Sequence, residues 1–310
     1  MRIAILGASS QIAKDLIISL PRARQENLLL YVRNLAETIA WLELNGLRGL
    51  CKVRDYKSYG ELPHEVVFNF VGVGDPLRAA EMGPRIFELT MRFDDLVLEG
   101  LARNPARRYF FISSGAVFGN NFDKPVTPAT QAVMPINGIA PRDYYGAAKL
   151  YAEVRHRAWR DFPIIDLRIF NMFSRTQDMD SRFFITDIVR AIRDDRVLQT
   201  SADYIVRDFM HPEDFHGLVE RLLMASPLNC AIDCYSREPI DKPSILQLMA
   251  HHFGLRYNVT GGRKAAVNAT GLKTHYYSLN RKAAEFGYHP RWSSAECILA
   301  ETAAVLGKSF

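Results

Sequence analysis

Cysteine is scarce in this chain, with four among 310 residues. Cys51, Cys230, Cys234 and Cys297 form neither a CxxC pair nor the ligand spacing of a zinc site, so we expect reduced thiols and no bound metal. The chain also lacks a signal-peptide layout, and no run approaches the roughly 20 apolar residues of a membrane helix. These absences predict a cytoplasmic protein without a membrane partner.

A concentrated block of positive charge is missing as well. The formal net charge is +5, but the 39 lysines and arginines are scattered along the sequence. Proteins that bind nucleic acid usually gather their basic residues into a patch. We therefore expect no nucleic-acid partner, and a small polyanionic ligand fits the charge better. Hydrophobic residues make up 48% of the chain, which is enough for a large core.

Short apolar runs alternate with helical patterns through the first half. Strands are expected at residues 2–6, 28–32, 47–53, 66–71, 109–112 and 164–170, and helices at 11–20, 86–101 and 145–160. Strands that are apolar throughout are typical of parallel sheets covered on both faces. The alternation predicts an α/β fold with a doubly wound parallel sheet.

The second half loses this alternation. Helices are expected at residues 181–193, 212–224, 246–253 and 294–306, and Ser293 and Glu296 can form a capping box for the last one. We therefore expect residues 1–170 to form the parallel-sheet domain and residues 171–310 a smaller, mostly helical domain. In an alternative division, a segment near 200–225 returns to the first domain.

The turn after the first strand has the spacing of a dinucleotide-binding loop. Ser10 and Ala13 stand where such a loop often carries its second and third glycines, so an ordinary strand-to-helix turn is the alternative. A pyrophosphate would rest on the amides at the start of the helix. The candidate cofactor contacts here are Gly7, Ser9, Ser10, Gln11 and Ile12.

Residues at the ends of the later strands extend this candidate cofactor site. Arg33 follows the second strand, where a cation favours the 2′-phosphate of NADP and an acidic residue would favour NAD. A solvated charge at a strand end is the alternative. Asp55, after the third strand, is a candidate for the adenine side, and Val71 and Gly72 would allow close approach of the backbone to the cofactor.

Tyr145 and Lys149 are four residues apart, so a helix places them on one face, one turn apart. A nearby ammonium lowers the pKa of a phenol and makes it useful for proton transfer at neutral pH. A chance pair on a helix surface is the alternative. Ser114 ends the fifth strand, at the edge where α/β proteins bind ligands. It can donate to a substrate oxygen or, as the alternative, cap a turn.

Together these motifs resemble the extended short-chain dehydrogenase/reductases, the group of nucleotide-sugar epimerases, dehydratases and reductases. The resemblance rests on Gly7-x-x-Ser10-x-x-Ala13, Ser114-x-x-Val117-Phe118-Gly119 and Tyr145-x-x-x-Lys149. Later matches are Leu167-Arg168-Ile169-Phe170-Asn171, Arg207-Asp208-Phe209-x-His211 and Gly287-Tyr288-x-Pro290, so the resemblance spans nearly the whole chain.

The resemblance implies hydride transfer between a nicotinamide and a carbon of a nucleoside-diphosphate sugar. Tyr145 would be the general acid/base, Lys149 would lower its pKa and bind the nicotinamide ribose, and Ser114 would hydrogen-bond the same sugar oxygen. Asn171 and Arg207 match positions that contact the diphosphate.

The family's architecture implies two further expectations. The smaller C-terminal domain would bind the nucleotide sugar. A homodimer would form through the helices that hold Phe93 and Tyr151.

Two departures from the family pattern narrow the expected reaction. Gly115 and Ala116 stand where 4,6-dehydratases carry Asp-Glu, and Ala116 also replaces a cysteine found in reductases that epimerise. We therefore expect an NADPH-dependent 4-ketoreductase of a 4-keto-6-deoxy sugar nucleotide. The alternative is a redox-neutral, NAD-dependent 4-epimerase, and a minor alternative is a non-catalytic dinucleotide sensor.

Overall fold

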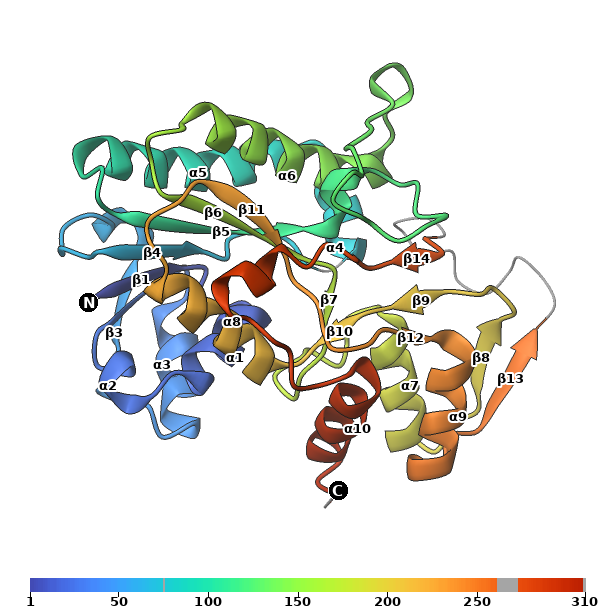
Figure 1. Ribbon diagram of the computed structural model, residues 1–310. Coiled ribbons are helices and arrows are strands. Elements are labelled where there is room, and N and C mark those ends of the chain that lie inside the picture. Colours follow the sequence, from blue (N-terminus) through green and yellow to red (C-terminus); the bar gives the residue numbers. More distant parts are fainter. Residues whose placement is uncertain (75, 261–272, 309–310) are drawn as a thin grey trace.

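The computed structural model describes residues 1–74, 76–260 and 273–308. Its centre is a seven-stranded sheet in the order β11-β6-β5-β4-β1-β2-β3 (Figure 1). All neighbouring strands are parallel, which confirms the predicted doubly wound sheet. The strands are Ile3–Leu6 (β1), Leu28–Val32 (β2), Lys52–Asp55 (β3), Val66–Asn69 (β4), Arg108–Ser114 (β5), Ile164–Ile169 (β6) and Cys230–Asp233 (β11).

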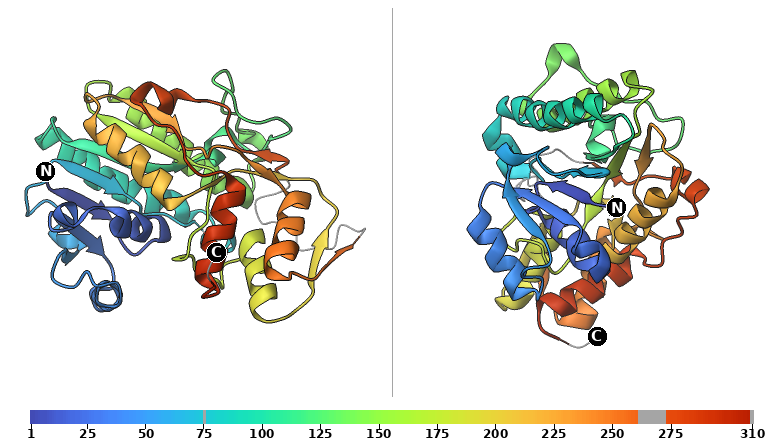
Figure 2. Two further views of the ribbon diagram at one scale, coloured as in Figure 1. Left: turned by 60° about the horizontal axis from the view of Figure 1, so that its bottom comes forward. Right: turned by 90° about the vertical axis from the view of Figure 1, so that its left-hand side faces the viewer.

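Helices cover both faces of this sheet, as both views in Figure 2 also show. One face carries α1 (Gln11–Ser19), α3 (Leu35–Leu44) and α8 (Pro212–Met224), and the other carries α5 (Arg85–Arg103) and α6 (Pro141–Ala158). Ile3 and Ile5 of β1 belong to the first core, whereas Ala4 and Leu6 belong to the second. Burial on both sides explains why these strands are apolar throughout.

Short elements occupy the connections. They are α2 (Arg22–Gln25), α4 (Pro76–Met82) and the 3₁₀ turns η1 (Tyr56–Ser58), η2 (Gly115–Phe118), η3 (Ile136–Gly138) and η4 (Lys282–Phe286). Among the described residues, no helix combines the length and the apolar character needed to cross a bilayer.

A smaller unit has its own core, which includes Phe173, Ile188, Met249 and Ile298. Its helices are α7 (Phe184–Arg193), α9 (Lys242–Phe253) and α10 (Ser294–Val305). Short strands pair around them: β8 (Leu198–Ser201) with β13 (Tyr257–Thr260), β7 (Asn171–Met172) with β10 (Phe209–Met210), and β9 (Val206–Arg207) with β12 (Ile240–Asp241) and β14 (His275–Tyr276).

The chain crosses back to the large sheet within its second half. Helix α8 shares the core of α1, and β11 pairs with β6 at the edge of the sheet. Residues 212–233 therefore lie against the parallel sheet although they follow β7. The four-residue strand β11 contains a cysteine and an aspartate, and its sequence has no apolar run that would have revealed it.

Several elements begin at other residues than the sequence pattern predicted. Strand β3 begins at Lys52 because the chain before it turns through Gly49, whose φ is +78°. Helix α6 begins at Pro141, one turn early, because the carboxylate of Asp143 accepts the N–H of Ala140 at 2.8 Å. The expected capping box before α10 is confirmed. All four cysteines are buried free thiols.

Candidate active site

The catalytic side chains predicted from the sequence meet at the carboxyl edge of the sheet. Ser114 ends β5, and its Oγ accepts the N–H of Ala116 at 3.2 Å. Tyr145 lies near the start of α6, and its phenol shares a hydrogen bond with Ser114. Helix α6 approaches η2 closely because Gly146 has no side chain: a Cβ there would lie 2.5 Å from the carbonyl oxygen of Ala116. This contact holds the tyrosine beside the serine.

Ser113 and Tyr144 stand next to Ser114 and Tyr145 in the sequence, but their side chains contact other residues. The hydroxyl of Ser113 donates to Oε1 of Glu153 at 2.5 Å. The ring of Tyr144 packs on Phe87 of α5, with 5.7 Å between the ring centres. Neither residue takes part in the cluster of the predicted serine and tyrosine.

Lys149 lies one helical turn after the tyrosine. Its Nζ donates to the carbonyl oxygen of Ile112 at 2.7 Å and lies 6.0 Å from the centre of the Tyr145 ring. Burial lowers the pKa of Lys149 to about 8, although nearby carboxylates oppose this shift. A Cβ on Gly72, which follows β4, would lie 3.4 Å from this ammonium. Lys149 thus faces the strand ends at which α/β proteins bind cofactors.

The expected lowering of the pKa of Tyr145 is wrong for this structure. Burial raises the pKa of its phenol, and the hydrogen bond with Ser114 opposes the shift only in part. The ammonium of Lys149 is held by the carbonyl of Ile112 rather than by the phenol. Helical spacing indicates that a cation is near the phenol, but the cost of removing a phenolate from water depends on burial, which spacing does not show. A protonated phenol is nevertheless the form that a proton donor requires.

Tyr276 of β14 joins the cluster from the smaller unit. Its hydroxyl lies 3.1 Å from Oγ of Ser114 and shares a hydrogen bond with it. Its ring packs edge-on against Phe122 and at a tilt against Phe170, with ring centres 4.8 and 5.2 Å away. The sequence offered only two adjacent tyrosines, and nothing in it showed which one would face the site.

A buried chain of charges supports the segment that carries this tyrosine. Arg168 donates to Oε2 of Glu153 at 2.5 Å and to Oδ1 of Asp233 at 3.3 Å. The other oxygen of Asp233 accepts the hydroxyl of Ser278 at 2.7 Å. Ser278 lies two residues after Tyr276, so these bonds link α6, β6 and β11 to the C-terminal segment.

Asn171 and Arg207, the predicted diphosphate contacts, lie on short strands beside Tyr276. The Asn171 amide lies 3.5 Å from the carbonyl oxygen of Tyr276. The guanidinium of Arg207 donates to the carbonyl oxygen of Lys273 at 2.7 Å and lies 5.9 Å from the centre of the Tyr276 ring. Burial lowers the pKa of Arg207 to about 10. Both residues therefore lie beside Tyr276. A second cation, Lys273, has its Nζ 4.6 Å from the centre of the same ring, and the sequence did not single it out.

Gly115 and Ala116 provide no acid beside Ser114. A Cβ on Gly115 would lie 2.4 Å from the ring of Phe170, so an aspartate cannot fit here unless that ring moves. Ala116 is buried against α6. Neither position can move a proton.

The turn after β1 fits a dinucleotide pyrophosphate. Gly7 has a φ of +74°, and a Cβ there would lie 2.8 Å from the amide nitrogen of Val71, so the position requires glycine. Ser10 has an extended backbone, which any residue adopts, and its Oγ accepts the N–H of Ala13 at 3.4 Å. The first amides of α1 have no acceptor within the helix and suit a phosphate. The other predicted contacts of this turn are the exposed Ser9 and the half-buried Gln11 and Ile12.

The predicted adenosine end lies at the carboxyl ends of β2 and β3. Arg33 is exposed directly after β2, and Asp55 ends β3 with one carboxylate oxygen bonded to the N–H of Lys57 at 2.7 Å. Tyr56 links this end to the glycine turn: burial raises the pKa of its phenol, while a hydrogen bond with the backbone of Gly7 and the charge of Arg33 lower it. No motif in the sequence predicted this role for Tyr56.

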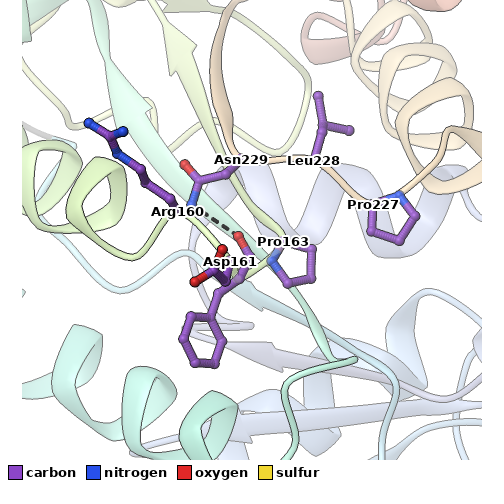
Figure 3. A pocket seen from close by; sticks show the side chains of 7 residues that line it. Arg160, Asp161, Pro163, Pro227, Leu228 and Asn229 are labelled. Atoms are coloured by element: carbon purple, nitrogen blue, oxygen red, sulfur yellow. Dashed lines mark hydrogen bonds between the residues drawn. The ribbon is translucent and has the colours of Figure 1, made fainter.

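We also searched the part of the chain that the structure describes for metal sites and for pockets away from the catalytic cluster. No group of three or more His, Cys, Asp or Glu side chains there could hold a metal ion. A separate pocket is lined by residues 160–163 and 227–229 (Figure 3). These residues directly precede β6 and β11, so the pocket lies at the amino ends of the strands, whereas Ser114 lies at the carboxyl end of β5. Asn229 closes its floor by donating to the carbonyl oxygen of Phe162 at 2.9 Å. This pocket plays no part in the catalytic cluster.

The profile of the NAD dependent epimerase/dehydratase family matches residues 3–226. No curated protein matches the sequence. The family match covers the whole glycine turn, the serine at the end of β5 and the tyrosine and lysine of α6.

Solved structures share the fold along the whole chain. MoeE5 in complex with UDP-glucuronic acid and NAD is 17% identical, with a TM-score of 0.76 over 97% of this chain and 98% of that one. UDP-glucuronic acid 4-epimerase from Bacillus cereus with NAD is 17% identical, with a TM-score of 0.76 over 98% of each chain. dTDP-glucose 4,6-dehydratase from Bacillus anthracis with NAD is 14% identical, with a TM-score of 0.78 over 97% and 95%.

Proposed function

The chain belongs to the NAD dependent epimerase/dehydratase family, and from this premise we propose that it is an NADPH-dependent reductase of a 4-keto-6-deoxy sugar nucleotide. The observation that carries the proposal is the cluster at the end of β5. There the hydroxyls of Ser114 and Tyr145 share a hydrogen bond, and the ammonium of Lys149 lies within 6.0 Å of the tyrosine ring. Such a cluster suits proton transfer at one substrate oxygen.

Each residue of the cluster has its own role in the reduction. Tyr145 donates its proton to the sugar oxygen at carbon four. Ser114 hydrogen-bonds the same oxygen and stabilises the negative charge that develops on it. Lys149 keeps a positive charge near this oxygen and, with Gly72, forms the wall facing the cofactor. The residues that would hold the dinucleotide are Gly7, Ser9, Ser10, Gln11, Ile12, Arg33, Asp55, Val71, Gly72, Tyr145 and Lys149, and its nicotinamide would supply the hydride.

Two observations favour reduction over the family's other reactions. The crowding at Gly115 and the apolar Ala116 argue against a dehydratase, which needs an acid and a base beside the serine. Arg33 at the end of β2 favours the 2′-phosphate of NADP, the coenzyme that reductases use.

A second candidate function is a redox-neutral 4-epimerase that retains NAD. Its support is the NAD in the B. cereus UDP-glucuronic acid 4-epimerase and in MoeE5, whose fold this chain shares. An epimerase oxidises and then reduces the same carbon, so it consumes no coenzyme. A non-catalytic sensor of dinucleotides is the remaining alternative.

Purified protein, NADPH and a 4-keto-6-deoxy sugar nucleotide test these functions together. The reductase oxidises NADPH in step with substrate loss, and Tyr145→Phe lowers this rate about 100-fold or more because the proton donor is lost. Tyr144→Phe is the matched control. Release of NAD on denaturation, with conversion of a sugar nucleotide but no net NADPH oxidation, would establish the epimerase instead. Binding of NADPH without either reaction would support the sensor.

The protein is proposed to act in the cytoplasm as a homodimer formed through α5 and α6. Tyr151 and Val154 on α6 are 52% and 58% exposed, whereas Phe93 of α5 is buried in the core of the sheet. Exposed apolar side chains on a helix are suited to a partner surface. Light scattering on the purified protein, with Tyr151→Glu as the disrupting variant, measures the oligomeric state.

A further inference from the structure

Ser174 is a fully buried serine that follows Phe173, a core residue of the smaller unit. Its Oγ donates to Oδ2 of Asp15 on α1, in the large unit, at 2.7 Å. Thr176 donates to the other oxygen of the same carboxylate at 2.7 Å. Burial raises the pKa of Asp15 to about 6, and the two hydroxyl bonds oppose this shift. A buried carboxylate is costly without donors, so at neutral pH Asp15 ties residues 174–176 to the first helix.

The hydroxyl of Ser174 also reaches the predicted cofactor turn. Gln11 is the first residue of α1, and its Nε2 donates to Oγ of Ser174 at 3.1 Å. Because the side chain is held there, Gln11 offers a coenzyme its backbone N–H, which has no acceptor within the helix. Amides in this position bind phosphate groups. Ser174 therefore lies one hydrogen bond away from a residue that would contact the pyrophosphate.

The same segment begins on the substrate side of the site. Asn171 of β7, a predicted diphosphate contact, lies three residues before Ser174. The next residue, Arg175, holds the segment to the smaller unit: its guanidinium donates to Oε1 of Glu301 on α10 at 2.7 Å, and its backbone N–H donates to Oε2 at 2.6 Å. Residues 171–176 therefore connect a predicted substrate contact with the cofactor turn, and they are fixed to both units.

We propose that Ser174 is a positioning residue that holds the cofactor turn through Gln11 and so couples coenzyme binding to the binding of a sugar nucleotide at Asn171. The proposal rests on the proposed function, because it takes Asn171 as a contact of the sugar nucleotide. A ligand that orders residues 171–176 from one end removes part of the conformational cost of binding at the other end. Each ligand then raises the affinity for the other by the same factor, as linkage requires.

Calorimetry measures this coupling without any turnover. NADP⁺ and NAD⁺ are titrated with and without saturating UDP or dTDP, and the two diphosphates are titrated with and without saturating coenzyme. Ser174→Ala removes the shared hydroxyl. Gln11→Met removes only the bond to it and leaves the Asp15 carboxylate with both donors. Thr186→Val is the matched control, because it removes a buried hydroxyl whose bonds stay within the smaller unit. Circular dichroism confirms that the variants are folded.

In wild type and in Thr186→Val, we expect each ligand to strengthen the other about fivefold or more. This factor should fall close to one in Ser174→Ala, in Gln11→Met and in the double variant, because all three break the same bond.

Three results overturn the proposal. They are a wild-type factor of one, no binding of either diphosphate to wild type, and a factor that Gln11→Met leaves unchanged. NADPH oxidation by wild type is measured separately. Coupling without reduction would leave this inference standing and remove the proposed reductase, whereas reduction without coupling would do the reverse.

Discussion

The hydroxyls of Ser114 and Tyr276 lie 3.1 Å apart and share a hydrogen bond, although 162 positions separate the two residues in the sequence. One belongs to the large sheet and the other to the C-terminal segment. A sugar oxygen bound at Ser114 must therefore meet a third hydroxyl besides those of Ser114 and Tyr145.

Tyr276→Phe removes this third hydroxyl and keeps the ring. We expect kcat/KM for the sugar substrate to fall about two- to tenfold, which corresponds to one hydrogen bond of about 0.5–1.5 kcal/mol. Coenzyme affinity should not change, because Tyr276 lies away from the glycine turn. Steady-state kinetics measure the effect, and Tyr277→Phe is the control. An unchanged kcat/KM would show that the hydroxyl only holds the free site together.

Gly146→Ala tests the close approach of α6 to η2. The new methyl group would lie 2.5 Å from the carbonyl oxygen of Ala116, so the helix must shift. We expect a loss of about 1–3 kcal/mol in the free energy of unfolding, together with lower activity because Tyr145 moves away from Ser114. Gly217→Ala in α8, where no atom lies within 4 Å of the added Cβ, is the matched control and should be neutral or stabilising. Equal midpoints in urea for the two variants would contradict the packing argument.

The parallel sheet could be predicted from the sequence because each strand shows its burial in its own run of apolar residues. Continuous apolar strands such as residues 28–32 identify burial on both faces, and the positions of Tyr145 and Lys149 follow from helical spacing alone. Strand β11 was not predicted because it lies at the edge of the sheet, where four residues that include Cys230 and Asp233 suffice.

The residues on the substrate side of the site could not be predicted, because they are brought together by contacts between distant segments of the chain. Tyr276 reaches Ser114 only because β14 pairs with β9. Lys273 becomes noteworthy only when its burial is known, since a lysine in a sequence is most often solvated. The pKa of Tyr145 was predicted in the wrong direction for the same reason: spacing reveals a nearby cation but not the desolvation of the phenol.

The lowered pKa of Lys149 predicts that both stability and activity depend on pH. Its pKa is about 8 in the folded chain, below the value of 10.5 expected when exposed. Between these values the unfolded state binds more protons, so this group makes the protein more stable as the pH rises from about 8 towards 10.5. Urea unfolding of wild type and Lys149→Met at pH 7 and 9.5 measures the difference, and only wild type should show this gain.

The activity has the opposite dependence on pH. Below about pH 8 the ammonium is charged and stabilises negative charge near Tyr145, so kcat/KM for reduction should fall as the pH rises through this value. Lys149→Arg, which stays charged, should lose the alkaline decline even if its overall rate is low. A wild-type profile that is flat to pH 10 would exclude Lys149 as the group responsible.

Arg33→Ser tests the choice of coenzyme. Arg33 is exposed at the end of β2, and no other predicted cofactor contact is positively charged except Lys149. A charge-assisted hydrogen bond to the 2′-phosphate contributes about 1.5–3 kcal/mol, so NADPH affinity should fall about ten- to hundredfold while NADH affinity changes little. Fluorescence titration of each coenzyme measures the two constants. Arg22→Ser, at an exposed arginine of α2 near the opposite end of β2, is the control. If the ratio of the two affinities stays the same in Arg33→Ser, the guanidinium does not recognise the 2′-phosphate, and the NAD-retaining epimerase becomes the better account of this site.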